Sequence, residues 1–169
     1  MKIILQTPRL YLREFTLDDA QLLIDLNSDP EVTRYTGDGP VKDPEDGQRI
    51  LREIILPQYV NKIGRWAVHL KDTNEFIGWC GLKHIADLNE TDLGYRFFQK
   101  HWGKGYATES SKAVMEYGLN TLKLQQIVGR ASVANINSIK VLEKCGLLYK
   151  EHAVEHGDET VKYGLEKSV

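Results

Sequence analysis

The strongest constraint on the fold is a change of periodicity in the second half of the chain. Thr91–Phe98 is rich in residues that favour strands, and Ala107–Leu122 places its apolar residues on one helical face. Gln126–Val133 then returns to a strand pattern. A strand, a helix and a second strand in this order predict a parallel crossover, with the helix packed on one face of a sheet.

The other elements follow from the same patterns. Strands are predicted at Leu10–Phe15, Arg65–Leu70, Glu75–Leu82, Leu147–Glu155 and Glu159–Glu166. Helices are predicted at Leu17–Asn27, from Asp43 onward with a kink or split at Pro57, and over Ile136–Cys145, whereas Asn27–Asp43 is predicted to be a loop. The order βααβββαβαββ predicts an α/β (α+β) fold, a mixed and mostly antiparallel sheet of about seven strands flanked by about four helices.

The composition favours a single soluble domain over residues 1–169. With 22 Lys and Arg against 24 Asp and Glu, the formal charge of -2 offers no field for gripping nucleic acid or an anionic membrane. No apolar run approaches the roughly 20 residues of a membrane helix, and Met1–Pro8 lacks the apolar segment of a secretory leader. Two cysteines suit a reducing cytosol, so we expect a cytoplasmic protein.

The turn that opens the central helix, Trp102–Thr108, is the first candidate ligand site. Gly103 and Gly105 would let the backbone approach a ligand closely, and a helix start is a natural seat for phosphate. The alternative is a turn that only links a strand to a helix. The dinucleotide fingerprint does not fit because Thr108 stands at its third small residue, and the P-loop does not fit because Gly105 follows Lys104.

A second candidate lies at the start of the next helix. Asn135 could simply cap that helix, which is the ordinary role of an asparagine there. The two helix starts nevertheless follow neighbouring parallel strands, and α/β sheets bind their ligands at such strand ends.

Four blocks of sequence together resemble the GNAT superfamily of acyl-CoA-dependent N-acetyltransferases, and within it the branch of ribosomal-protein-alanine N-acetyltransferases. They are Thr7–Phe15, Leu93–Arg96, Trp102–Glu109 and Asn135–Gly146, in an order and spacing that cover nearly the whole chain. Gly105 and Ala107 match the family's phosphate loop, whereas Trp102 stands where the family has Gln or Arg. Because backbone amides bind the phosphates, we expect that departure to matter little.

The resemblance implies a GNAT-like fold and a binding site for acetyl-CoA as co-substrate. Amides of the loop would hold the pyrophosphate, exposed strand backbone would pair with the pantetheine arm, and the later helix would line its path. Carried over by position, the cofactor-binding residues are Phe97, Phe98, Trp102, Gly103, Lys104, Gly105, Tyr106, Ala107, Thr108, Asn135, Asn137 and Ser138.

The resemblance also indicates where catalytic groups would lie. Leu142 occupies the position at which many relatives have a tyrosine general acid, so Ser138 is the predicted substitute donor to the CoA sulfur. Asp92 resembles the position of a glutamate base in some relatives and could work through a water. The alternatives are that Ser138 is only a polar residue in the first turn of its helix and that Asp92 is only a solvated acid at the start of its strand. Glu109 is explained by the helix dipole.

The predicted reaction is direct transfer of an acetyl group from acetyl-CoA to a primary amine, foremost a protein or peptide N-terminal α-amine. A small-molecule amine acetyltransferase and a non-catalytic acyl-CoA-binding module are the alternatives. No metal is predicted, because none of the five histidines falls in a ligand pattern. Ser28–Lys62 and the final hairpin would form the acceptor side, with Tyr35, Trp66 and Trp79 as wall or core residues. A homodimer paired through that hairpin is compatible with the sequence.

Overall fold

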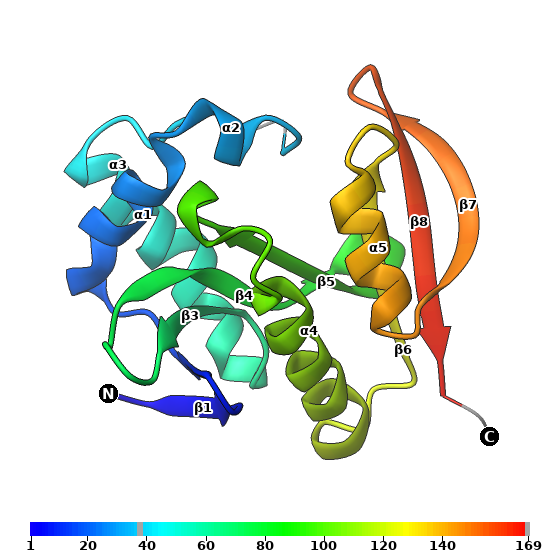
Figure 1. The fold of residues 1–169 in the computed structure, drawn as a ribbon, viewed down its shortest axis with the longest axis horizontal. Helices are drawn as coiled ribbons and strands as arrows, with labels where there is room; N and C mark the ends of the chain where they lie inside the picture. Colours follow the sequence, from blue (N-terminus) through cyan, green and yellow to red (C-terminus); the bar gives the residue numbers. More distant parts are fainter. Residues whose placement is uncertain (37–38, 168–169) are drawn as a thin grey trace.

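The computed structural model describes residues 1–36 and 39–167 and contains one eight-stranded sheet, ordered β1-β2-β3-β4-β5-β6-β8-β7 (Figure 1). The strands are β1 (Ile3–Gln6), β2 (Leu10–Arg13), β3 (Arg65–Leu70), β4 (Phe76–Ile85), β5 (Glu90–Phe97), β6 (Gln126–Ser132), β7 (Leu148–Glu155) and β8 (Asp158–Glu166). Among the described strands, only β5 and β6 pair in parallel, and every other neighbouring pair is antiparallel. The predicted mixed, mostly antiparallel sheet is therefore confirmed.

In the part of the chain that the structure describes, five α-helices and several short 3₁₀ or π turns cover the sheet. The α-helices are α1 (Ala20–Asn27), α2 (Pro30–Thr33), α3 (Pro44–Ile50), α4 (Tyr106–Glu116) and α5 (Ile136–Lys144). The other helical turns are η1 (Leu17–Asp19), η2 (Leu51–Ile55), η3 (Leu56–Asn61), η4 (Ala86–Leu88), η5 (Gln99–His101) and η6 (Tyr117–Thr121). The described residues include no helix with the length and apolar character needed to span a membrane.

Besides short 3₁₀ turns, one strand and one α-helix of the described residues were not predicted from the sequence. The N-terminal strand β1 pairs with β2 and brings the strand count to eight rather than seven. The segment predicted as a loop contains α2, because the Asp29 side chain accepts a hydrogen bond from the Glu31 amide and Pro30 suits the first helical position. Residues 37 and 38 of that predicted loop lie outside the described residues.

The helix that starts after Asp43 changes character along its length, as Pro57 predicts. The Asp43 side chain accepts the amide hydrogen of Asp46 at 2.8 Å and caps α3. The chain then continues as the π turn η2 and the 3₁₀ turn η3, which contains Pro57. α3 itself ends at Ile50, and Pro57, which cannot donate the regular helical hydrogen bond, lies at the start of the 3₁₀ turn where the π turn ends.

The two faces of the sheet bury different hydrophobic clusters, because side chains alternate along each strand. The first face, against α4 and α5, buries Trp66, Val68, Cys80, Leu82, Leu93, Val114, Ile127 and Leu142. The second face, against α1, α3 and η2, buries Phe15, Leu23, Leu26, Leu51, Ile55 and Ala67. The sheet thus separates two compartments of the molecule, one beside α4 and α5 and the other beside α1 and α3.

The sheet opens between β5 and β6. Their register is limited to the pair Asp92 and Val128, whereas β4 and β5 pair over eight positions. Beyond Asp92 the two strands diverge, and α4 and α5 lie near this gap (Figure 1). Through this gap, a group on one face of the sheet can reach a group on the other face.

Candidate active site

The glycine-containing loop before α4 has the backbone conformation that a phosphate site requires. Gly103 and Gly105 have φ angles of 74° and 83°, in the left-handed region that side chains disfavour. Gly105 is the N-cap of α4, so the first amides of the helix lack partners within it. These amides and the positive end of the helix could hold the pyrophosphate of acetyl-CoA.

The segment between β1 and β2 supports this loop from outside. Thr7 donates its hydroxyl to the Glu109 carboxylate at 2.5 Å, and Arg9 donates Nε to the same carboxylate at 2.7 Å. Arg9 also donates Nη1 to the Lys104 carbonyl at 3.0 Å and lies over the Tyr106 ring at 4.4 Å. The helix dipole alone therefore does not account for Glu109, whose role the linear sequence could not show.

The backbone hydrogen-bonding groups at the end of β5 point in two directions. The Phe98 amide donates to the Ile77 carbonyl at 3.1 Å, so it faces β4. The Phe97 carbonyl accepts the Trp102 indole N–H at 2.9 Å, which ties the phosphate loop to the strand end. The N–H and C=O groups of successive residues point to alternate sides of a strand. Those of Tyr95 and Phe97 therefore point toward the gap between β5 and β6. The candidate edge for the pantetheine arm is thus Tyr95 and Phe97, rather than Phe97 and Phe98.

A cleft of about 740 Å³ runs through the gap and brings three of the predicted residues together. Asp92, Asn135 and Ser138 line it, whereas Asn137 is exposed and, like the residues of the phosphate loop, does not. On the acceptor side, Tyr35 and Trp79 are wall residues. Trp66 is 1% exposed and belongs to the core.

A hydrogen bond between side chains bridges the gap. The Tyr95 hydroxyl of β5 and the Ser138 hydroxyl of α5 lie 3.0 Å apart. Burial raises the pKa of Tyr95 to about 12, so this hydroxyl keeps its proton at neutral pH. The sequence analysis did not identify Tyr95 as a site residue. Its place in the Leu93–Arg96 block, which resembles the family, is the feature that could have indicated it.

The neighbours of Ser138 explain its position. The Asn135 side chain accepts the Ser138 amide hydrogen at 3.2 Å, so the capping role of Asn135 also fixes the serine. Leu142, at the position of the family's tyrosine acid, is 3% exposed and packs against Gly129 of β6. A Cβ at Gly129 would lie 2.5 Å from the leucine side chain. Leu142 is therefore a packing residue.

Asp92 lies at the point where β5 and β6 separate. Burial raises the pKa of Asp92 to about 6, although Arg65, Arg130 and Lys83 oppose the shift. The Arg130 guanidinium is 3.6 Å away, and among the described residues Oδ1 of Asp92 has no hydrogen-bond partner. A buried carboxylate that titrates just below neutrality has the property expected of a general base.

Cys80 lies in the core beside α4 rather than in the lining of the cleft. Burial raises the pKa of Cys80 to about 11, so the thiol is protonated at neutral pH and is a poor nucleophile. Over residues 1–36 and 39–167, no group of three or more His, Cys, Asp or Glu side chains is arranged to hold a metal ion.

Sequence comparison identifies the family. The family described as Acetyltransferase (GNAT) domain matches residues 9–148. The chain belongs to the GNAT acetyltransferase family. GNAT acetyltransferases use acetyl-CoA, which agrees with the phosphate loop and the open sheet edge described above.

Two curated relatives of this GNAT protein are named as N-acetyltransferases. The uncharacterized N-acetyltransferase p20 of Bacillus licheniformis is 35% identical over 150 residues, covering 85% of this chain and 84% of that protein. The uncharacterized N-acetyltransferase YoaA of Bacillus subtilis is 33% identical, covering 85% of this chain and 81% of that protein. Both names thus give the same activity, N-acetyl transfer.

Solved structures share the GNAT fold over almost the whole chain. The RimL ribosomal L7/L12 α-N-protein acetyltransferase in complex with CoA has a TM-score of 0.84 at 19% identity, covering 98% of both chains. A spermidine N-acetyltransferase from Vibrio cholerae, in complex with CoA and spermine, has a TM-score of 0.80 at 18% identity, covering 95% and 96% of the two chains. At these identities the likeness establishes the fold, and the two proteins act on different kinds of amine.

Proposed function

We propose that this GNAT protein transfers an acetyl group from acetyl-CoA directly to the N-terminal α-amine of a polypeptide. The observation that carries the proposal is the cleft through the gap between β5 and β6. Asp92 on the second face of the sheet and the Tyr95–Ser138 pair on the first both line this cleft. In this proposal a base and an acid would act from opposite sides of one opening.

Acetyl-CoA would approach from the side of α4 and α5. The amides from Gly103 to Thr108 would hold the pyrophosphate, with Trp102 fixing the loop against the end of β5. The backbone edge at Tyr95 and Phe97 would then pair with the pantetheine amides, as an added strand does. Asn135 lines the same path. This arrangement directs the thioester toward Ser138.

The amine would approach from the other face, beside α1 and α3. Asp92 accepts a proton from the amine through a water, and the neutral nitrogen attacks the thioester carbonyl carbon to form a C–N bond. As the C–S bond breaks, Ser138 donates its proton to the departing sulfur. Tyr95 would in turn donate to Ser138, whose hydroxyl is 3.0 Å away, so that the serine is reprotonated. The second proton of the attacking nitrogen would leave to solvent through the water at Asp92, and solvent would return a proton to Tyr95.

The choice of an α-amine follows from the proton that must be removed. An α-amine has a reference pKa of about 8, against about 10.4 for lysine, so about a tenth of it is already neutral at pH 7. A lysine-directed site must supply about 3.4 kcal/mol more for deprotonation. Within the described part of the cleft, Asp92 is the carboxylate whose pKa lies near neutrality. One such base suits an amine that loses its proton easily, which is the α-amine.

The decisive experiment compares two peptides of the same sequence. One has a free N-terminus and a blocked lysine, and the other has a blocked N-terminus and a free lysine. Release of free CoA thiol should give a higher kcat/KM for the first. Equal or higher activity on the lysine peptide would refute the α-amine as acceptor. Binding of acetyl-CoA without turnover on peptides, amino acids, polyamines or aminoglycosides would favour a non-catalytic module instead.

A further inference from the structure

Four charged side chains lie together on one face of three neighbouring strands. Glu90 and Asp92 are two residues apart on β5, so both point to the same face. Val128 of β6 is the register partner of Asp92, and Arg130 lies two residues beyond it. The register partner of Arg130 on β8 is Lys162. Because register partners and alternate residues share a face, two carboxylates and two cations meet there.

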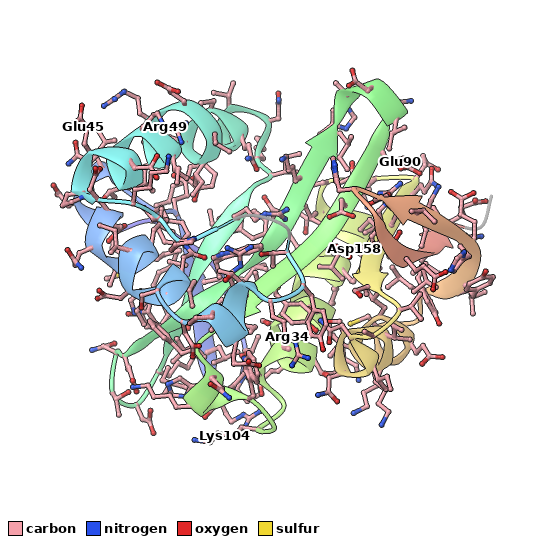
Figure 2. All side chains as sticks on the ribbon, turned by 90° about the horizontal axis from the view of Figure 1, so that it is seen from above. Arg34, Glu45, Arg49, Glu90, Lys104 and Asp158 are labelled. Atoms are coloured by element: carbon pink, nitrogen blue, oxygen red, sulfur yellow. The ribbon has the colours of Figure 1, made fainter. Side chains whose placement is uncertain are left out.

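Glu90 holds both cations of this group. Nη2 of Arg130 donates to Oε1 of Glu90 at 2.5 Å, and Nζ of Lys162 lies 2.6 Å from Oε2. The Glu90 side chain is buried, and Figure 2 shows the residue at the start of β5, beside the hairpin of β7 and β8. One carboxylate thus uses its two oxygens to join β5 to cations of β6 and β8.

The contact between Arg130 and Asp92 is of a different kind. Nη1 of Arg130 lies 3.6 Å from Oδ1 of Asp92, which is longer than a hydrogen bond of about 2.9 Å. Both atoms are buried, and neither has a hydrogen-bond partner among the described residues. The guanidinium therefore attracts the Asp92 carboxylate by its charge but donates no hydrogen to it.

The other contacts of Arg130 hold it away from Asp92. Its Nη2 is bound to Glu90 at 2.5 Å, and its Nε lies 3.5 Å from Glu155 of β7. A guanidinium is planar and rigid, so its contacts at two nitrogens fix the position of the third. The contact with Glu90 is short and buried, whereas Glu155 is half-exposed. Glu90 therefore has the larger part in setting how closely Arg130 approaches Asp92.

A closer approach would weaken Asp92 as a base. A hydrogen bond from a guanidinium favours the charged form of a carboxylate, and such a partner lowers the pKa of an aspartate by about one to three pH units. In the observed arrangement burial raises the pKa of Asp92 to about 6. The charged groups that act on Asp92 from the neighbouring strands are Arg65 of β3, Lys83 of β4, Arg130 of β6 and the carboxylate of Glu90 on β5.

We propose that Glu90 is a positioning residue of the transfer reaction. By holding Nη2 of Arg130, it keeps Nη1 out of hydrogen-bonding range of Asp92 and leaves that carboxylate able to accept the proton of the amine. This proposal rests on the proposed function, in which Asp92 is the base. Glu90 does not line the cleft, so it acts on the base rather than on a substrate.

Glu90 can fill this role over the whole pH range in which Asp92 titrates. Although burial opposes ionisation, the hydrogen bonds from Arg130 and Lys162 hold the pKa of Glu90 below its ordinary value. Glu90 is therefore already ionised at pH values near 6, where Asp92 gains or loses its proton. Its hold on Arg130 does not depend on the state of the base.

The test measures the pKa of Asp92 in the protein without acetyl-CoA. Aspartate is labelled with ¹³C at its carboxyl group, and the NMR signal of Asp92 is the one that disappears in Asp92→Asn. In Glu90→Gln the guanidinium loses its charged partner and can turn toward Asp92, so we expect the pKa of Asp92 to fall by about one pH unit or more. Glu159→Gln removes the same charge from an exposed position of β8 outside the cleft lining and should leave that pKa unchanged.

A double-mutant cycle separates an effect through Arg130 from a direct effect of the Glu90 charge. Arg130→Gln should raise the pKa of Asp92, because a nearby cation is lost. Glu90→Gln in the Arg130→Gln background should then change it little, since Glu90 no longer has a guanidinium to hold. An equal fall in both backgrounds would show a direct effect of charge and overturn the positioning role.

A surface variant keeps the test independent of folding. Glu155→Gln removes the half-exposed partner of Arg130 and should lower the pKa of Asp92 by a smaller amount. It replaces Glu90→Gln in the test if that protein does not fold, and an unchanged pKa of Asp92 would then contradict the proposal.

The pH profile of activity separates this proposal from the proposed function. In Glu90→Gln the fall of kcat/KM near pH 6 should move to about pH 5 or lower, together with the pKa of Asp92. A pKa of Asp92 that stays at about 6 in the folded variant would refute the role of Glu90 alone. A pKa that falls while the profile of kcat/KM stays in place would refute Asp92 as the base, and with it the mechanism of the proposed function.

Discussion

Arg9 and Glu109 join the first segment of the chain to the start of α4, with Nε of the arginine 2.7 Å from the glutamate carboxylate. The glutamate also accepts the Arg9 amide and the Thr7 hydroxyl. Although burial opposes ionisation, these hydrogen bonds hold the pKa of Glu109 below its ordinary value. Arg9 extends the same interaction to the Lys104 carbonyl and so fixes the phosphate loop from outside.

We expect Arg9→Gln to weaken acetyl-CoA binding about five- to tenfold with little change in kcat, because the loop loses its external support. Calorimetry measures the affinity for acetyl-CoA, and thiol release measures KM and kcat, so the two together separate weaker binding from slower turnover. Arg52→Gln, at an exposed position of η2 outside the cleft lining, is the matched control. An Arg9→Gln protein with normal acetyl-CoA affinity would show that the bracing is dispensable.

Gly105→Val should weaken acetyl-CoA binding strongly, since valine disfavours a φ of 83° and its Cβ would lie 3.3 Å from the Arg9 guanidinium. Gly157→Val is the control for backbone strain. Gly157 has a φ of 84° in the turn between β7 and β8, and nothing lies within 4 Å of a Cβ there. If both folded variants bind acetyl-CoA equally, the pyrophosphate does not lie at the start of α4.

Ser138→Ala should reduce kcat by about a hundredfold while acetyl-CoA affinity changes little, because a donor to the transition state is lost. Tyr95→Phe should also reduce kcat, since Ser138 then lacks the hydroxyl 3.0 Å away. The double variant should be no slower than Ser138→Ala, because both residues act on one proton. Effects that multiply would instead assign the two hydroxyls separate roles, and normal kcat in Ser138→Ala would exclude the serine.

The pH profile should report Asp92. Because its pKa is raised to about 6, the carboxylate is protonated below that pH and cannot accept a proton, so kcat/KM should fall as the pH drops through 6. The rate should rise further toward pH 8 as an α-amine loses its proton. Asp92→Asn should lower kcat/KM by about a hundredfold and remove the bend near pH 6. Asp87→Asn, exposed in η4, should keep it. A bend that persists in Asp92→Asn would assign the base to another group.

The sequence alone determined those features that depend on neighbours along the chain. The crossover from β5 through α4 to β6 follows from alternating and helical periods, and the Asp43 cap and the break at Pro57 follow from local backbone chemistry. Gly103 and Gly105 are predictable for the same reason, since the need for a left-handed backbone is local. The short strand β1 was missed because its pairing with β2, rather than its own pattern, stabilises it.

Only the tertiary structure decided which side chains meet across the sheet. Tyr95 and Ser138 are 43 residues apart in the chain, and Arg9 and Glu109 are 100 residues apart. Neither pair leaves a periodic signal, because each depends on how strands and helices pack. The raised pKa of Asp92 likewise depends on burial at the point where β5 and β6 part. The order of the elements is local in origin, whereas the pairing of charges and hydroxyls in the cleft is a property of the packed sheet.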